Sequence, residues 1–286
     1  MNGLCLSGGG IKGICHVGVI KAFEEEGIKF ECISGTSSGS IVASMYAAGL
    51  TSDEMYEIFK KYAKEVSKIN YIIILKLIYG IIFKRKIIID GLNKGKKIKN
   101  ILNKELLKKD IRNISDIKIP LIIPSVNVYD GSIYMFSSLK DKRNYSDDVV
   151  NINDIDIGEA VQASCAYPGV FCPVNYKDVK LVDGGVRENI PWKELKEIGA
   201  EKVISIVFES EKKEKININM LDCITKSMGI LMHELYNYEI EDIDYLIKIK
   251  TKDISLLDVC KLDELYETGY ETIKRKIKEI KKYLNN

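Results

Sequence analysis

Several residue types and patterns that mark unusual protein classes are scarce in this sequence of 286 residues. It has only five prolines, and hydrophobic residues make up 46% of it, which excludes collagen-like, low-complexity and disordered chains. Its most apolar window, residues 71–83, contains Lys76 and is shorter than the roughly 20 apolar residues that span a bilayer. The N-terminal residues carry neither the basic stretch nor the apolar run of a signal peptide. We therefore expect a cytoplasmic protein.

Histidines and paired cysteines are also scarce. The chain has two histidines and seven cysteines, and no two cysteines are spaced as C-x-x-C. This odd, scattered set matches neither a zinc site nor a disulfide framework, and we expect no metal. Cys5, Cys15 and Cys32 lie among apolar residues, so we expect them to be buried as small hydrophobic side chains.

An excess of one charge sign occurs only locally. The 43 basic and 41 acidic residues leave a net charge of +2, which favours no charged partner, and we expect no binding to nucleic acid. Between residues 60 and 118, however, 17 lysines and arginines stand against 5 acidic residues, a local charge of +12. The remainder of the chain therefore carries −10.

What the sequence does contain is an alternation of strands and helices. We expect strands at residues 3–6, 28–33, 121–128, 132–137, 171–174, 179–182 and 202–208. We expect helices after residue 10 and at residues 38–48, 192–198 and 262–284. Asp130 and Gly131 form a hairpin signal between two of the strands. Met55, Ile58 and Phe59 recur at helical spacing and predict a buried stripe. The alternation favours a mainly parallel sheet with helices on its faces.

The pentapeptide at residues 35–39 has the pattern G-x-S-x-G with Ser37 at its centre. It follows an apolar strand and precedes a helix of small residues, the context in which this pattern forms a nucleophile turn. Gly35 and Gly39 would relieve crowding there, so that the serine Oγ projects at the helix N-terminus, where the dipole favours a developing alkoxide. A turn that only caps the helix is the alternative, but the context favours a nucleophile.

Residues 8–13, G-G-G-I-K-G, form a glycine-rich loop between the first strand and the first helix. The spacing fits a dinucleotide-binding loop, which requires an acidic residue at the end of the second strand. Glu31 comes too early in that strand, which continues into the serine turn. The other interpretation is an oxyanion hole, in which consecutive glycine amides face a tetrahedral intermediate. Because neighbouring βα turns open on one edge of a parallel sheet, the loop and Ser37 would face each other, and we favour the oxyanion hole.

A serine nucleophile needs a base, and the chain offers three candidates. His16 lies among apolar residues of the first helix, which favours a packed structural role, and His233 lies in a helical stretch. The order Ser37, Asp183, His233 fits an α/β-hydrolase triad, but that fold places several strands before its serine and here two precede it. Asp183 ends an apolar strand, and desolvation there would raise its pKa toward that of a useful base. A turn aspartate is the alternative role for this residue.

Taken together and in this order, the glycine loop, the serine turn and the D-G-G at residues 183–185 resemble the patatin-like phospholipases. Residues 163–174 also resemble the family's A-S-x-A-x-P-x-x-F-x-P-V stretch, and Asn189 and Pro191 fit its pattern. The resemblance spans about residues 3–208. It implies a three-layer α/β/α sandwich with a mainly parallel central sheet, and acyl-ester hydrolysis of lipids of the phospholipase A or lysophospholipase type, without a cofactor.

The resemblance also implies the roles of individual residues. Ser37 would be the nucleophile and Asp183 its proton acceptor, without a histidine. The oxyanion hole would come from Gly8, Gly9, Gly10, Ile11, Lys12 and Gly13, and the motif after the base from Gly184 and Gly185. The family commonly has arginine where this chain has Lys12, which replaces a bidentate fork for a lipid phosphate with a point charge. Esters other than phospholipids therefore stay open as substrates. Acyl transfer in place of hydrolysis is a separate alternative that also stays open.

We expect one catalytic domain over residues 1–208, with a basic helical insertion at about 53–118, and a mainly helical C-terminal extension of that domain at 209–286. The basic segment 60–118, with its apolar window 71–83, is either a peripheral contact with anionic membrane or a core helix with solvated lysines. A dinucleotide-binding oxidoreductase and a catalytically silent lipid-binding module are more distant alternatives. The oligomeric state is left open.

Overall fold

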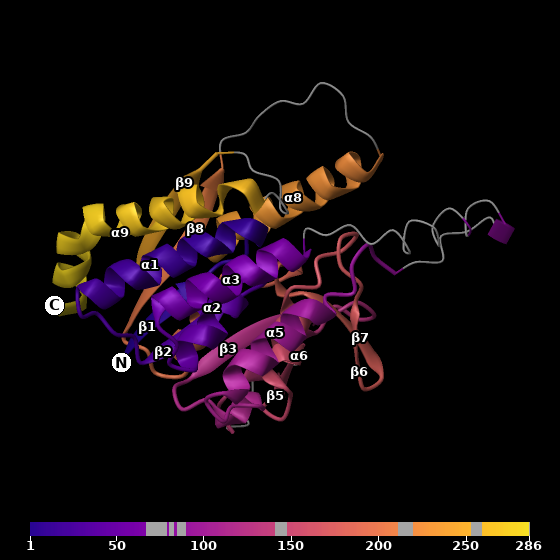
Figure 1. The fold of residues 1–286 in the computed structure, drawn as a ribbon, viewed down its shortest axis with the longest axis horizontal. Coiled ribbons are helices and arrows are strands. Elements are labelled where there is room, and N and C mark those ends of the chain that lie inside the picture. The colour runs from indigo at the N-terminus through magenta and orange to yellow at the C-terminus, as the bar shows by residue number, and fades with distance from the viewer. Residues whose placement is uncertain are drawn as a thin grey trace.

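The computed structural model describes residues 1–66, 79, 83–84, 90–140, 148–210, 220–252 and 259–285 (Figure 1). The strands are β1 (Asn2–Leu6), β2 (Cys32–Gly35), β3 (Leu121–Asn127), β4 (Ile133–Ser137), β5 (Val149–Ile152), β6 (Val174–Tyr176), β7 (Val179–Asp183), β8 (Lys202–Ser210) and β9 (Tyr245–Thr251). The helices are α1 (Ile14–Glu25), α2 (Ser38–Ala47), α3 (Ser52–Val66), α5 (Lys96–Leu107), α6 (Ile157–Ser164), α7 (Lys193–Glu197), α8 (Met220–Glu239) and α9 (Leu262–Asn285).

All of these strands belong to one sheet. The main path runs β5-β4-β3-β2-β1-β8-β9, while β7 pairs with β3 and β6 pairs with β7. The pairs β1–β2, β1–β8, β2–β3, β4–β5 and β8–β9 are parallel, and β3–β4, β3–β7 and β6–β7 are antiparallel. The expected mainly parallel sheet is therefore confirmed.

Apolar side chains on the two faces of the sheet form two separate cores. In β1, Leu4 and Leu6 belong to the larger core, which also takes side chains from α1, α2, α3, α5, α6 and α9. Cys5, between them, belongs to the smaller core, which also contains Leu195 of α7. Tyr236 of α8 packs against this smaller core. This alternation is the two-residue period of a strand buried on both faces. The expected three-layer α/β/α arrangement is confirmed.

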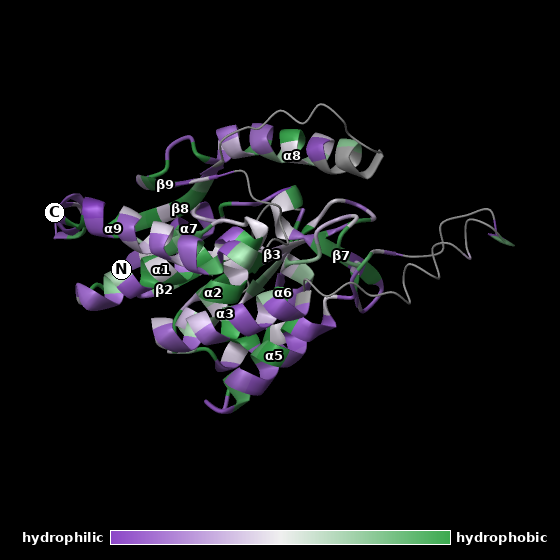
Figure 2. Cartoon of the chain, turned by 45° about the horizontal axis from the view of Figure 1, so that its top comes forward, coloured by the Kyte–Doolittle hydropathy of each residue, from purple (hydrophilic) through white to green (hydrophobic). Residues whose placement is uncertain are grey.

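The helices present one apolar side to the sheet. Met55, Ile58 and Phe59 of α3 are buried, as their spacing predicts, and Ile273 and Ile280 of α9 are fully buried. Helices α5 and α9 carry hydrophilic as well as hydrophobic residues along their length (Figure 2), as expected for helices with one solvated side.

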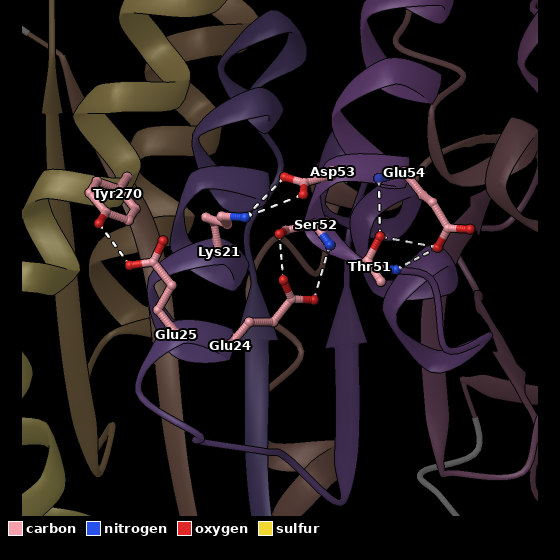
Figure 3. Close-up of polar contacts among 8 residues, drawn as sticks. All are labelled: Lys21, Glu24, Glu25, Thr51, Ser52, Asp53, Glu54 and Tyr270. Atoms are coloured by element: carbon pink, nitrogen blue, oxygen red, sulfur yellow. Dashed lines mark hydrogen bonds and ion pairs between the residues drawn. The ribbon is translucent and has the colours of Figure 1, made fainter.

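Polar contacts fix the start of α3 against the end of α1 (Figure 3). Thr51 and Glu54 form a capping box, because Thr51 N–H donates to the Glu54 carboxylate at 2.8 Å and Glu54 N–H donates to Thr51 Oγ1 at 3.3 Å. The carboxylate of Glu24 accepts the N–H of Ser52 at 3.0 Å and also its hydroxyl. These bonds satisfy the backbone N–H groups of Thr51, Ser52 and Glu54. Backbone N–H groups at the start of a helix have no acceptor within the helix itself.

Strand bounds are where the sequence-based expectations are wrong. The second strand begins at Cys32 and not at residue 28. The reason is that the Phe30 N–H donates to the Tyr46 hydroxyl, and this hydroxyl donates to the Phe30 carbonyl, so the Phe30 backbone does not pair with a strand. The strand expected at 171–174 begins only at Val174, and Phe171 forms an isolated bridge with Asn93. The β3–β4 hairpin around Asp130 and Gly131 is confirmed.

The order of pairing on β3 determines where the functional segments meet. Parallel β2 pairs with the first residues of β3, with Ser34 opposite Ile122, and antiparallel β7 pairs with the last ones, with Asp183 opposite Ser125. The two short strands therefore run toward each other along the same side of β3. Because Ile122 and Ser125 are three residues apart, the carboxyl ends of β2 and β7 meet within about 10 Å.

The apolar window at residues 71–83 and the basic residues 84–86 lie outside the described residues, apart from Tyr79, Phe83 and Lys84. Within the parts of the chain that are described, no helix is long and apolar enough to cross a membrane.

Candidate active site

Ser37 occupies the tight turn between β2 and α2. Its φ is 51° and its ψ is −124°, and a positive φ is uncommon for a residue with a side chain. Close packing forces this geometry, because a Cβ on Gly39 would lie 2.2 Å from the carbonyl oxygen of Leu6 in β1. A Cβ on Gly35 would lie 2.6 Å from the Gly39 backbone. Both flanking glycines are thus required for the turn that projects the serine side chain.

Hydrogen bonds stabilise the strained turn. The Ser37 N–H donates to Oγ of Ser164, the last residue of α6, at 3.0 Å. The Ser37 carbonyl accepts the Ser40 hydroxyl at 2.6 Å and the Ser40 N–H at 2.9 Å. Ser164 belongs to the family-like stretch at residues 163–174, but its bond to Ser37, 127 residues away, could not be predicted from that pattern. Ser37 also precedes the first residue of α2, where the helix dipole favours negative charge.

Asp183, the last residue of β7, is only 1% exposed. Its Oδ1 accepts the Gly185 N–H at 2.8 Å. Burial raises the pKa of Asp183 from 3.8 to about 7, and hydrogen bonding by the Ser37 side chain and the Gly185 amide offsets part of that rise. The buried Oδ2 has no hydrogen-bond partner among the described residues. In enzymes without bound substrate, catalytic hydrogen bonds are often long or poorly aligned and tighten when substrate binds.

The glycine loop after β1 lies directly against the serine. A Cβ on Gly8 would come within 3.1 Å of Ser37 Cβ. The Gly8 N–H already donates to Asn189 Oδ1 at 3.1 Å. In the described part of the chain, the amides of Gly9 and Gly10 have no hydrogen-bond partner, and Gly10 has a φ of 60°, which favours glycine. Gly9 and Gly10, and not Gly8, therefore have amides available for an oxyanion.

A cavity of about 360 Å³ adjoins these groups, within the range of about 300–1,000 Å³ of small-molecule sites. The polar part of its lining comprises the loop residues 8–10 and 12 together with Ser37, Ser38, Asp183 and Asn189. The rest is mainly apolar and comprises Ile11, Tyr62, Ala63, Cys165, Tyr167, Val170, Phe171, Phe208, Gly229, Met232 and Val259. A nucleophile in the wall of a mainly apolar cavity suits an ester with an acyl chain.

Neither histidine is placed to act as a base. His16 is fully buried, its Nε2 lies 2.9 Å from the Ser7 carbonyl oxygen, and burial lowers its pKa to about 4. The predicted packed, hydrogen-bonded role of His16 is confirmed. His233 is exposed on α8, stacks on Tyr236 at 5.7 Å and does not line the cavity.

The alternative dinucleotide site lacks its acidic residue. Glu31 is exposed and accepts the N–H of Asn2 at 2.7 Å, which places it at the start of β1, whereas the glycine loop follows the end of that strand. Among the described residues, no group of three or more His, Cys, Asp or Glu side chains is arranged to hold a metal.

Comparisons with known proteins agree with this geometry. The family model for the patatin-like phospholipases matches residues 4–196. Lysophospholipase NTE1 of Lodderomyces elongisporus is 28% identical over 204 residues, and that of Debaryomyces hansenii is 30% identical over 204 residues. These matches cover 71% of this chain but only 12% and 11% of those much longer proteins. The uncharacterized protein YqhO of Bacillus subtilis is 29% identical over 223 residues, covering 75% of this chain and 73% of that protein.

Among solved structures, VipD from Legionella pneumophila superposes with a TM-score of 0.56 and 18% identity, over 97% of this chain and 67% of that one. At this identity the likeness shows a shared fold. The match of the family model over residues 4–196 covers well over half of the chain. This protein therefore belongs to the patatin-like phospholipase family.

Proposed function

We propose that the protein hydrolyses acyl esters of lipids, as a phospholipase A or lysophospholipase, through an acyl-enzyme on Ser37. The observation that carries this proposal is the placement of Ser37, in its strained turn, beside a buried Asp183 whose pKa is about 7. The apolar cavity next to them, the family membership and the relatives named lysophospholipase support a lipid substrate.

Asp183 is the general base of the proposed reaction. A base works best when its pKa lies near the working pH, since it is then ionised and still takes up a proton readily. The ionised Asp183 accepts the proton of the Ser37 hydroxyl while Oγ attacks the ester carbonyl carbon. Negative charge thereby moves from the buried carboxylate to the carbonyl oxygen.

Gly9 and Gly10 are the proposed oxyanion donors. Their amides face the charge that develops on the carbonyl oxygen, and each such donor is worth about 10² to 10³ in kcat. When the tetrahedral intermediate collapses, Asp183 returns its proton to the leaving alcohol or lysophospholipid. Water then attacks the acyl-enzyme, with Asp183 taking and returning a proton once more, and the fatty acid leaves.

Lys12 bears on the choice of substrate. It lines the cavity beside the glycine loop, where an ammonium group suits a lipid phosphate as a point charge. A phosphate-free ester would fit the same apolar cavity, and an alcohol in place of water would make the site an acyltransferase. Product analysis separates these two alternatives from phospholipid hydrolysis.

We also propose a peripheral contact with anionic lipid through the basic segment, residues 60–118. Its local charge of +12 supports attraction to an anionic surface. Tyr62 and Ala63, near its start, line the cavity, so the segment begins at the wall of the candidate site. Co-sedimentation with neutral and with anionic vesicles tests this contact, and equal binding to both would contradict it.

For the domain organisation, we propose one catalytic unit at residues 1–208 with an insertion at about 53–118, and residues 209–286 as an extension of the same domain. Met232 and Val259 of the extension line the cavity, and β9 pairs with β8. This placement supports an extension that completes the substrate site.

Lipid-product profiling of the wild type beside Ser37→Ala tests the proposed function. We expect the wild type to release fatty acid and Ser37→Ala to release none. Ser44→Ala is the matched control, since its hydroxyl bonds to the Ile41 carbonyl inside α2 and it does not line the cavity. Release of fatty acid by a folded Ser37→Ala protein would contradict the assignment.

A further inference from the structure

One peptide group in the glycine loop is held on both sides by side chains. The carbonyl oxygen of Ser7 lies 2.9 Å from His16 Nε2, and the N–H of Gly8 donates to Asn189 Oδ1 at 3.1 Å. These two atoms belong to the same peptide unit, and in a trans peptide they point in opposite directions. His16 and Asn189 therefore fix the plane of the Ser7–Gly8 peptide, and we call this arrangement the peptide clamp.

The tautomer of His16 follows from its partner. A carbonyl oxygen can only accept, so Nε2 carries the proton, and Nδ1 is the bare nitrogen of a neutral ring. Nδ1 is buried and has no hydrogen-bond partner among the described residues. The single N–H of His16 is thus committed to the Ser7 carbonyl.

Both halves of the clamp are themselves anchored. The His16 ring packs on Phe208 with ring centroids 4.6 Å apart. Asn189 N–H donates to Glu239 Oε1 of α8 at 2.6 Å, and Trp192 Nε1–H donates to the Glu239 carbonyl at 2.9 Å. The clamp therefore joins α1, the loop after β7 and α8 to one peptide of the glycine loop.

The loop needs this support because it has little of its own. Gly8, Gly9 and Gly10 have no side chains to pack, and glycine loses more conformational freedom on ordering than any other residue. A rotation of the Ser7–Gly8 peptide would turn the next two amides, which are the proposed oxyanion donors. A misplacement of about 1 Å at such a site costs on the order of 10²-fold in rate.

We infer that His16 and Asn189 are positioning residues that orient the amides of Gly9 and Gly10 for the oxyanion. This inference rests on the proposed hydrolase function. The clamp acts on the transition state, where the oxyanion exists, and leaves the binding of ground-state ligands unchanged.

Matched variants of His16 test the clamp. His16→Leu removes the donor and keeps an apolar side chain in the buried site, whereas His16→Gln keeps an N–H at about the place of imidazole Nε2. With a soluble short-chain nitrophenyl ester, we expect kcat to fall about 10²-fold in His16→Leu with KM unchanged, and to recover to within about tenfold of wild type in His16→Gln.

Asn189→Leu removes the acceptor at a less buried position and serves where His16→Leu does not fold. We expect the same loss in kcat, about 10²-fold. Because both side chains hold one peptide, the double variant His16→Leu/Asn189→Leu should lose little more than either single one.

Two binding probes separate positioning from a merely structural role. An alkyl trifluoromethyl ketone adds to the serine oxygen and places an oxyanion in the hole, so its affinity should fall in parallel with kcat/KM. The affinity for lauric acid, a ground-state product, should stay unchanged. Three results would each overturn the clamp. The first is a wild-type kcat in folded His16→Leu or Asn189→Leu, and the second is an equal loss of kcat in His16→Leu and His16→Gln. The third is a loss of lauric acid affinity that parallels the loss of kcat. A wild type that neither hydrolyses the ester nor binds the ketone would instead overturn the proposed function, and the clamp with it.

Discussion

Replacement of Asp183 by asparagine should abolish catalysis and stabilise the fold at neutral and alkaline pH. The two side chains have the same shape, and asparagine Oδ1 can still accept the Gly185 N–H. What the substitution removes is a carboxylate that must be ionised to act as a base in a site where its charge is desolvated. At Asp183 the ionised carboxylate that catalysis requires therefore lowers the stability of the fold.

The magnitude follows from the pKa of Asp183. Burial raises that pKa from 3.8 to about 7. The folded state consequently binds more protons than the unfolded state between about pH 4 and pH 7, so the free energy of unfolding falls as pH rises through that window. At about 1.4 kcal/mol per pKa unit, the loss amounts to about 4 kcal/mol. The Asp183→Asn protein does not carry this loss.

Urea unfolding of the wild type and Asp183→Asn at a series of pH values measures the effect. Glu188, Glu194 and Glu239 are also carboxyls with raised pKa values, but they occur in both proteins and cancel in the difference. We expect the stability of Asp183→Asn relative to wild type to grow by about 4 kcal/mol between about pH 4 and pH 8. In parallel, wild-type kcat/KM should rise about tenfold per pH unit up to about pH 7 and then level off. A difference in stability that does not change with pH, or a rate profile governed by a pKa near 4, would refute the reasoning.

Three further substitutions have defined consequences. Gly39→Ala should prevent the folded turn, with mostly insoluble protein on expression, because its Cβ would lie 2.2 Å from the Leu6 carbonyl oxygen; a soluble, active Gly39→Ala would contradict this packing. Ser164→Ala should lower the free energy of unfolding by about 1–3 kcal/mol and reduce kcat, because the Ser37 N–H loses its partner. Urea titration measures the first effect and ester hydrolysis the second. A variant with wild-type stability and wild-type kcat would count against the contact. Thr51→Ala should cost about 1 kcal/mol in urea unfolding through the lost helix cap and leave kcat unchanged, so a change in kcat would be unexpected.

The layers of the fold could be predicted from the sequence because the relevant signals are local. Leu4, Cys5 and Leu6 alternate between the two cores as strand residues do, and Met55, Ile58 and Phe59 recur at helical spacing. Strand bounds were less predictable. Phe30 resembles a strand residue in an apolar run, but its backbone bonds to the Tyr46 hydroxyl, a partner 16 residues away.

The candidate site was predictable in its residues but not in its geometry. Ser37 and Asp183 stand out from their motifs, yet β7 reaches the site as an antiparallel strand, opposite in direction to β2. Register along β3 depends on which strands pair, and the sequence of a single strand does not specify its neighbour. Ser164 and Asn189 lie in stretches that fit the family pattern, but that pattern does not specify their contacts with partners 127 and 181 residues away.

The most direct test of the Ser37–Asp183 pair is covalent labelling with an alkyl fluorophosphonate, located by peptide mass spectrometry. A fluorophosphonate reacts with an activated serine oxygen and loses fluoride, so one adduct reports one nucleophile. We expect a single adduct on the peptide that contains Ser37, loss of lipid hydrolysis in proportion to labelling, and far slower labelling of Asp183→Asn. An adduct on a different residue, or full hydrolytic activity after complete labelling of Ser37, would contradict the account.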